Sequence, residues 1–140
     1  MFVREEDLVR VLIADDSAVV CERVKTMLLE LPEIEIAGQA RDAVEATKSI
    51  LELKPDVVIL DIRMPGGSGI EVLRKIKQHK TAPAVIMLTN YPYPQYRKRC
   101  MDAGADFFLD KSSEFNKIVE ILKQMLEDSS RHSTPEAKEE

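Results

Sequence analysis

The sequence predicts an α/β protein built on one five-stranded parallel sheet with helices on both of its faces. Two observations lead to this prediction. Short apolar runs of the length of buried strands alternate along the chain with longer segments whose apolar residues recur at helical spacing. The chain has 140 residues, of which 44% are hydrophobic and 32% charged, and this fits one soluble globular domain.

Five segments are predicted to form the strands. Four are continuous apolar runs rich in branched side chains, as buried parallel strands are: 11–14, 57–60, 85–88 and 107–109. The fifth segment, 33–37, alternates polar and apolar residues, which favours an edge strand with one wet face. It lies second along the chain, and right-handed crossovers then permit the strand order 2-1-3-4-5.

Helical patterns follow each strand. The residues at or just before the predicted helix starts are Ser17, Asp42, Gly69, Gln95 and either Ser112 or Ser113. The fourth helix is short and polar, while the fifth carries apolar residues at helical spacing up to Leu126. The glycine-rich loop 66–69 lacks the frame of a P-loop, and we interpret it as a plain turn into the third helix.

The domain is predicted to span residues 8–127. The remaining segment, 128–140, is polar, contains Pro135 and ends in charged residues, so we expect a disordered tail or a linker stub.

Composition excludes several classes of protein. A net charge of −5 argues against a nucleic-acid-binding module, and no apolar run approaches the roughly 20 residues of a membrane helix. The acidic N-terminal segment lacks the apolar region of a secretory signal. Cys21 and Cys100 lie far apart in sequence, which indicates free thiols. We therefore expect a cytoplasmic protein that contacts neither membrane nor nucleic acid directly.

Polar residues stand at the ends of four of the five predicted strands. They are Asp15 and Asp16, then Asp61, then Thr89, then Asp110 and Lys111. Open α/β sheets place their active crevice at the carboxyl ends of the strands, and the order 2-1-3-4-5 brings these four ends together. The second strand ends only in Gln39 and Ala40, as an edge strand outside the site would.

These residue types together favour phosphoryl transfer. Three carboxylates in one crevice would raise one another's pKa unless a cation lay between them, and Mg²⁺ prefers carboxylates plus substrate phosphate. Lys111 supplies a positive charge and Thr89 a hydroxyl donor. Singly, each residue has a plainer interpretation: Asp15 and Asp16 as helix-capping acids, Thr89 as a turn residue, Lys111 as a solvated cation.

The motifs resemble the response-regulator receiver domains of two-component systems over residues 9–127. The segments that carry the resemblance are 12–17, 55–66, 87–89, 104–106 and Lys111. It implies a flavodoxin-like fold and a switch that accepts a phosphoryl group on Asp61 from a sensor histidine kinase or a phosphotransfer protein. It also implies that the chain catalyses only its own phosphoryl transfer and dephosphorylation and is not otherwise an enzyme.

The resemblance further implies a Mg²⁺ site. Asp16 and Asp61 would be ligands, Asp15 would act through a water, and the backbone carbonyl of Arg63 would complete the protein's share. Lys111 would pair with the phosphoryl group.

Two further positions would act as the switch. Thr89 would move toward the phosphoryl group, and Phe108 occupies the position of the aromatic switch residue. Phe108 could equally be a plain core residue, or serve in both ways, and it lacks the hydroxyl of the commoner tyrosine.

A lid over Asp61 is predicted from Arg63, Asn90 and Tyr91. The residues two beyond Asp61 and two beyond Thr89 are best placed to admit or exclude an attacking water, and here they are the bulky Arg63 and Tyr91. Arg63 could instead point to solvent. The family commonly has proline after the lysine, where this chain has Ser112, and this leaves open whether that peptide bond is cis.

Signal output is expected through the face of the fourth helix, fifth strand and fifth helix, in contact with a partner or as a homodimer. All three tyrosines, Tyr91, Tyr93 and Tyr96, cluster at its start, and aromatic residues are favoured in interface cores. Arg97, Lys98 and Arg99 could pair with acids such as Glu120 across a homodimer.

Two other functions compete with this interpretation. A haloacid-dehalogenase-type phosphatase also uses an aspartate nucleophile, threonine, lysine and Mg²⁺, but its acid pair comes last along the chain and here it comes first. Turnover of a phosphomonoester would favour it. A receiver-like domain that only binds partners would lack phosphoryl transfer, and a phosphodonor assay separates the two.

Overall fold

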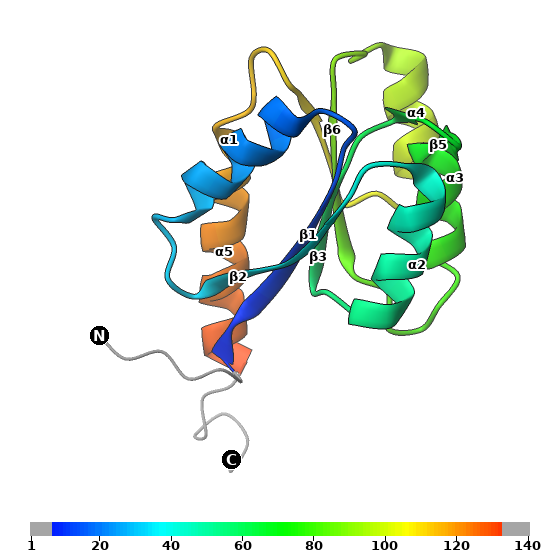
Figure 1. Ribbon diagram of the computed structural model, residues 1–140. Helices are drawn as coiled ribbons and strands as arrows, with labels where there is room; N and C mark the ends of the chain where they lie inside the picture. Colours follow the sequence, from blue (N-terminus) through cyan, green and yellow to red (C-terminus); the bar gives the residue numbers. More distant parts are fainter. Residues whose placement is uncertain (1–6, 133–140) are drawn as a thin grey trace.

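The computed structural model describes residues 7–132 and confirms the predicted fold (Figure 1). A five-stranded parallel sheet has the order β2-β1-β3-β6-β7, which is the predicted 2-1-3-4-5. Its strands are β1 (Val9–Ala14), β2 (Ile34–Ala40), β3 (Val57–Leu60), β6 (Ala84–Thr89) and β7 (Phe107–Asp110). The sequence did not predict a small antiparallel pair after β3, formed by β4 (Arg63–Met64) and β5 (Gly67–Ser68).

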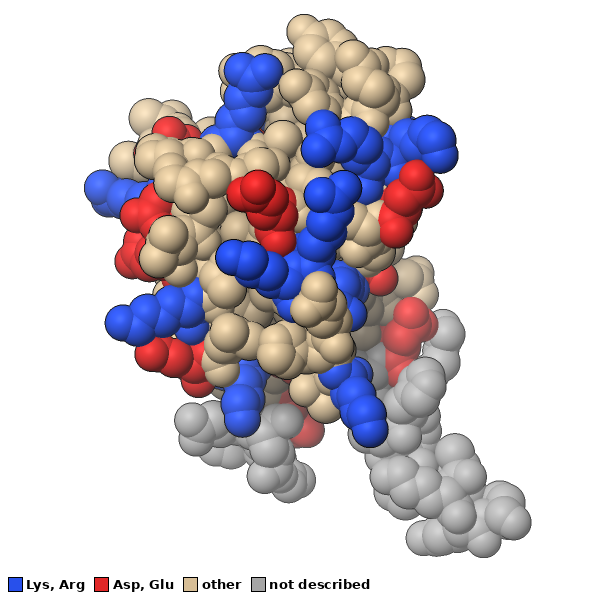
Figure 2. All heavy atoms as spheres, turned by 90° about the vertical axis from the view of Figure 1, so that its right-hand side faces the viewer, with Lys and Arg blue, Asp and Glu red and all other residues tan. Residues whose placement is uncertain are grey.

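Helices cover the sheet in two layers. One face carries α1 (Ala18–Leu28) and α5 (Lys117–His132), and the other carries α2 (Ala43–Leu53), α3 (Gly69–Ile76) and α4 (Pro94–Asp102) (Figure 1). The outer surface of the second layer carries many Lys and Arg side chains (Figure 2).

Alternate residues of the inner strands face opposite layers. Val58 and Leu60 of β3 belong to the core on the α2–α3–α4 side, whereas Val57 and Ile59 belong to the core on the α1–α5 side. Successive side chains of a strand point to opposite faces, so a strand covered on both faces must be apolar throughout. This explains the continuous apolar runs in the sequence.

The first two predicted helix caps are confirmed. The Ser17 hydroxyl accepts a hydrogen bond from the backbone N–H of Val20 (3.2 Å), and the Asp42 carboxylate accepts one from the N–H of Glu45 (2.7 Å). The third helix is capped by Ser68, one residue before the predicted Gly69. The loop before it forms the β4–β5 hairpin, which is more ordered than the plain turn that the sequence predicted.

The fifth helix differs from the prediction at both ends. It begins at Lys117, after a turn in which the Ser112 N–H and hydroxyl both donate to Asp110 Oδ1 (2.9 and 2.8 Å). The Lys111–Ser112 peptide is trans, since no peptide bond within the described range is cis. The helix continues to His132, into the predicted tail, because residues 117–132 contain neither proline nor glycine. Residues 133–140 lie outside the described part.

The two cysteines are buried free thiols, as predicted. Burial raises the pKa of Cys100 to about 11, which keeps this thiol protonated and unreactive. Between residues 7 and 132, no helix has the length and apolar character required to cross a membrane.

We expect Gly69→Ala to lower the free energy of unfolding by about 1–3 kcal/mol, the usual range for overpacking a buried position. Gly69 is buried at the start of α3, and a Cβ atom there would overlap the backbone carbonyl oxygen of Asp61. Backbone cannot move aside as a flexible side chain can. Urea unfolding of both proteins measures the change, and an unaltered free energy would contradict this close packing.

Candidate phosphoacceptor site

The structure brings four predicted site residues together at the carboxyl edge of the sheet. One carboxylate oxygen from each of Asp15, Asp16 and Asp61 lies within 4.8 Å of the other two. The Lys111 ammonium lies 2.8 Å from Asp15 Oδ2 and 3.2 Å from Asp61 Oδ2. The segments at the carboxyl ends of β1, β3 and β7 thus supply three acids and one cation to a single cluster.

Backbone hydrogen bonds fix these positions. The N–H of Asp61 donates to the carbonyl of Ala14 (3.0 Å), which extends the β1–β3 pairing by one residue. The N–H of Lys111 donates to the carbonyl of Thr89 (2.8 Å), which extends the β6–β7 pairing by one residue. The rigid sheet therefore carries both the acid and the cation.

The site is buried on one side and open on the other. Asp15 and Asp61 are 3% and 6% exposed and Lys111 is 9% exposed, whereas Asp16 is exposed. Burial raises the pKa of Asp61, although the Lys111 charge opposes the rise. Burial alone would lower the pKa of Lys111, but its hydrogen bond to Asp15 and the charges of both carboxylates raise it. Lys111 is therefore held in its charged form.

One oxygen of Asp61 has no partner among residues 7–132. Asp61 Oδ1 is buried and accepts no hydrogen bond from the described residues, while Oδ2 contacts Lys111. A buried carboxylate oxygen is normally satisfied by a donor or a cation. This free oxygen, with the neighbouring oxygens of Asp15 and Asp16, fits a hard divalent cation such as Mg²⁺.

Two of the predicted lid residues contact each other. The guanidinium of Arg63 lies 4.2 Å from the centroid of the Tyr91 ring, and its Nη2 donates to the Tyr96 hydroxyl (3.4 Å). The Tyr91 N–H donates to the Thr89 hydroxyl (2.9 Å), which ties the stack to the end of β6. Arg63 is thus exposed but held against tyrosines, and Asn90 is also exposed. Tyr96 was not predicted to take part.

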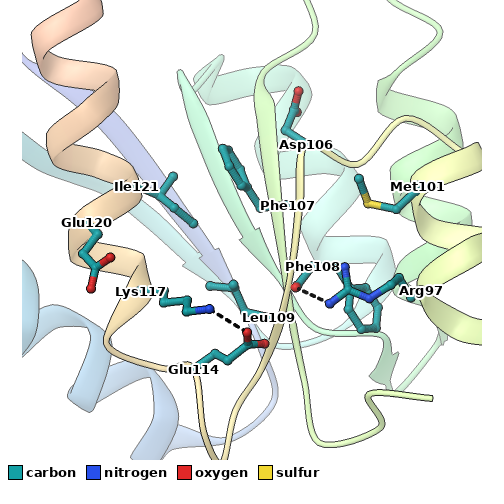
Figure 3. A pocket seen from close by; sticks show the side chains of 10 residues that line it. All are labelled: Arg97, Met101, Asp106, Phe107, Phe108, Leu109, Glu114, Lys117, Glu120 and Ile121. Atoms are coloured by element: carbon teal, nitrogen blue, oxygen red, sulfur yellow. Dashed lines mark hydrogen bonds and ion pairs between the residues drawn. The ribbon is translucent and has the colours of Figure 1, made fainter. Parts of the chain in front are cut away.

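The two predicted switch residues are both buried. Thr89 is fully buried and Phe108 is 4% exposed, within the core on the α2–α3–α4 side. The Arg97 guanidinium lies 4.9 Å from the Phe108 ring centroid and donates to the Phe108 carbonyl (3.4 Å; Figure 3). No pattern in the sequence predicts this contact, because no periodicity relates a residue of α4 to one of β7.

We expect Asp61→Asn to raise the melting temperature near neutral pH by roughly 2–6 °C when EDTA is present. The raised pKa of Asp61 means that its contribution to stability is complete below the ordinary carboxyl pKa and is lost as pH rises through the folded value. Asparagine removes this loss. Thermal unfolding between about pH 4 and pH 7 should show the variant's advantage growing with pH, and an advantage that shrinks would contradict the argument.

The chain belongs to the receiver domains of two-component response regulators. The sequence model of the family described as "Response regulator receiver domain" matches residues 11–123. This agrees with the sheet order and with the acidic cluster beside a lysine. Phosphorylation and magnesium are typical of this family.

Two named relatives illustrate the match. The chain is 30% identical over 118 residues to the response regulator GacA of Pseudomonas aeruginosa, covering 84% of this chain and 55% of that protein. It is 37% identical over 119 residues to protein-glutamate methylesterase/protein-glutamine glutaminase 1 of Carboxydothermus hydrogenoformans, covering 84% of this chain and 35% of that protein. The chain thus spans about half or less of these relatives.

Solved structures show the same fold. The response regulator domain of Thermotoga maritima CheB superposes with a TM-score of 0.75 at 30% identity, covering 87% of this chain and 96% of that one. A CheY-like receiver domain protein from Methanospirillum hungatei gives 0.77 at 27% identity, covering 90% and 99%.

Proposed function

We propose that this receiver domain accepts a phosphoryl group on Asp61 from a histidine kinase or a phosphotransfer protein. The observation that carries the proposal is the Asp61 carboxylate itself, which is buried beside Lys111 with Oδ1 free of any partner among the described residues. A carboxylate that is held in place beside a cation and shielded from bulk water is suited to act as a nucleophile.

In the proposed step, an Asp61 oxygen attacks the phosphorus of a phosphohistidine. A P–O bond forms as the P–N bond breaks, and the imidazole leaves with the electron pair and takes up a proton. Lys111 compensates the negative charge on the phosphoryl oxygens, as a fixed cation should when transfer depends chiefly on positioning and electrostatics.

Asp15, Asp16, Asp61 and the backbone carbonyl of Arg63 would hold Mg²⁺, with Asp15 acting through a water. A bound Mg²⁺ supplies positive charge that neutralises the phosphoryl oxygens. The orphan oxygen of Asp61 and the three clustered carboxylates support this assignment.

Thr89 and Phe108 would couple the presence of the phosphoryl group to the position of α4. The Thr89 hydroxyl accepts a hydrogen bond from the Tyr91 N–H. The Arg97 guanidinium contacts the Phe108 ring and donates a hydrogen bond to the Phe108 carbonyl. A Thr89 hydroxyl that turns toward the phosphoryl group would release the Tyr91 N–H and with it the loop before α4.

Incubation with acetyl phosphate tests the proposal. In Mg²⁺ the intact mass should rise by one phosphoryl group, and EDTA should prevent the gain. A chain that gains no phosphoryl group would be a domain that only binds partners. Steady turnover of p-nitrophenyl phosphate would instead indicate a phosphatase of the haloacid-dehalogenase type.

The face of α4, β7 and α5 is proposed as the output surface. It carries a hollow of about 400 Å³ whose lining includes Arg97 on α4 and Glu120 on α5, on either side of β7 (Figure 3). Phe107 lines the hollow and is 37% exposed, and Tyr93, the residue just before α4, is 51% exposed. Opposite charges beside exposed aromatic side chains suit a two-fold homodimer, in which the same surface meets itself. Lys98 is less available than the sequence predicted, since it pairs with Asp102 (3.0 Å).

We expect Tyr93→Ala to weaken homodimerisation of the beryllofluoride-activated protein by about tenfold, because exposed tyrosines are frequent anchors of interfaces. Sedimentation velocity over a range of concentrations measures the dimer. Val19→Ala removes an exposed apolar side chain on α1 and is the matched control. Activated protein that stays monomeric would refute the homodimer.

A further inference from the structure

A cationic surface covers α3, α4 and the adjoining hairpin, although the chain has a net charge of −5. Residues 63–106 contain eight Lys or Arg against three Asp or Glu, whereas the whole chain contains 20 against 25. The eight are Arg63, Arg74, Lys75, Lys77, Lys80, Arg97, Lys98 and Arg99. Figure 2 shows basic side chains gathered over this side of the molecule.

The few acids of this segment are already engaged within the protein. Their partners are Lys98 for Asp102 (3.0 Å), Lys77 for Asp106 (2.9 Å) and the Ser68 N–H for Glu71 (3.3 Å). Across residues 7–132, no acid forms an ion pair with Arg63, Arg74 or Arg99. The surface therefore presents uncompensated guanidinium groups.

A hollow of about 400 Å³ opens in this surface between the β4–β5 hairpin and α4. Its lining includes three buried apolar side chains, Ile62, Met64 and Ile70. Arg63, Tyr96 and Arg99 line it as well, and they are only partly buried or exposed. No acid from the described part of the chain lines it, whereas the hollow on the α4–β7–α5 face is lined by both Glu114 and Glu120.

We propose that this hollow docks an acidic segment of a partner protein. An apolar side chain of that segment would enter against Ile62, Met64 and Ile70, and its carboxylates would meet Arg63 and Arg99. Guanidinium groups bind carboxylates through paired hydrogen bonds, and Arg and Tyr are enriched among the residues that dominate interface energies. Charge complementarity selects an acidic partner, and the apolar lining favours a protein side chain over a phosphate backbone.

Fluorescence anisotropy tests the docking site with a fluorescein-labelled peptide in which Leu and Phe are flanked by Asp and Glu. Arg99→Gln should weaken binding about tenfold or more, as expected for loss of a hydrogen bond between charged groups. Lys98→Gln is the matched control, because it removes the same charge from the next residue of α4 but does not line the hollow. It should change the affinity less than about twofold.

Several outcomes would overturn the proposal. They are no binding to the wild-type protein, equal weakening by both substitutions, and undiminished affinity for a peptide with Asn and Gln in place of its acids. Tighter binding of a single-stranded oligonucleotide of equal charge would indicate a nucleic acid surface instead. Arg99→Gln should still gain a phosphoryl group from acetyl phosphate, so this test and that of the phosphoacceptor role fail independently.

Discussion

Lys111→Met should slow phosphorylation by acetyl phosphate in Mg²⁺ by about 100-fold, the usual effect of removing one group that stabilises a transition state electrostatically. Lys111 is the cation that contacts both Asp15 and Asp61, at 2.8 and 3.2 Å. Methionine keeps much of the side chain's length and apolar contact but removes the charge. The developing negative charge on the phosphoryl oxygens would then lose its fixed counterion.

The rate is measured as the gain in intact mass with time. Lys77→Met is the matched control, because Lys77 is also partly buried and ion-paired, with Asp106 at 2.9 Å, but lies outside the acidic cluster. Circular dichroism should show that both variants are folded. A Lys111→Met protein that is folded and phosphorylated at the wild-type rate would remove Lys111 from the mechanism.

A variant with Arg63→Asn and Tyr91→Glu together should lose its phosphoryl group at least about tenfold faster than the wild type, equivalent to roughly 1.4 kcal/mol in the barrier. The stack of Arg63 on Tyr91 is further held by the Tyr96 hydroxyl and the Thr89 hydroxyl. Hydrolysis needs a water in line with the bond to phosphorus, and the stack would hinder its approach. Asparagine is smaller than the arginine that it replaces, and the amide of asparagine and the carboxylate of glutamate can each orient an attacking water.

The decay is followed after removal of the phosphodonor, in Mg²⁺. A variant with Arg74→Asn and Phe107→Glu makes equivalent changes at an exposed arginine and an exposed aromatic residue away from the stack. This control should decay like the wild type. The shielding idea fails if the Arg63/Tyr91 variant loses its phosphoryl group no faster than the control variant.

The sequence was sufficient to predict the sheet order and the convergence of the site. Four of the five strands are apolar runs that stop at Asp15, Asp61, Thr89 or Asp110, and parallel topology then places these ends at one edge. The caps at Ser17 and Asp42 were equally legible, because a capping side chain bonds to backbone only two or three residues away. The strands are visible as apolar runs and the caps as contacts between residues close in sequence, so both can be predicted from short segments of the chain.

Contacts between distant segments could not be predicted in the same way. Arg97 reaches Phe108 from another element, and Arg63 reaches Tyr96 across 33 positions of the chain. The delayed start of α5 depends on Asp110, whose side chain holds the turn at Ser112. Such contacts depend on side-chain directions that periodicity does not contain. The cationic hollow was missed for the same reason, since Arg97 and Arg99 look alike in sequence but line hollows on different sides of α4.

Location of the phosphoryl group is the most direct test of the central claim. After reaction with acetyl phosphate in Mg²⁺, borohydride reduces the acyl phosphate and marks its site for peptide mass spectrometry. We predict the mark at Asp61 alone, no gain of mass in Asp61→Asn, and a normal gain in Asp102→Asn, which alters an exposed acid on α4. An equal gain of mass in Asp61→Asn, or a mark at Asp15 or Asp16 in the wild-type protein, would contradict the account.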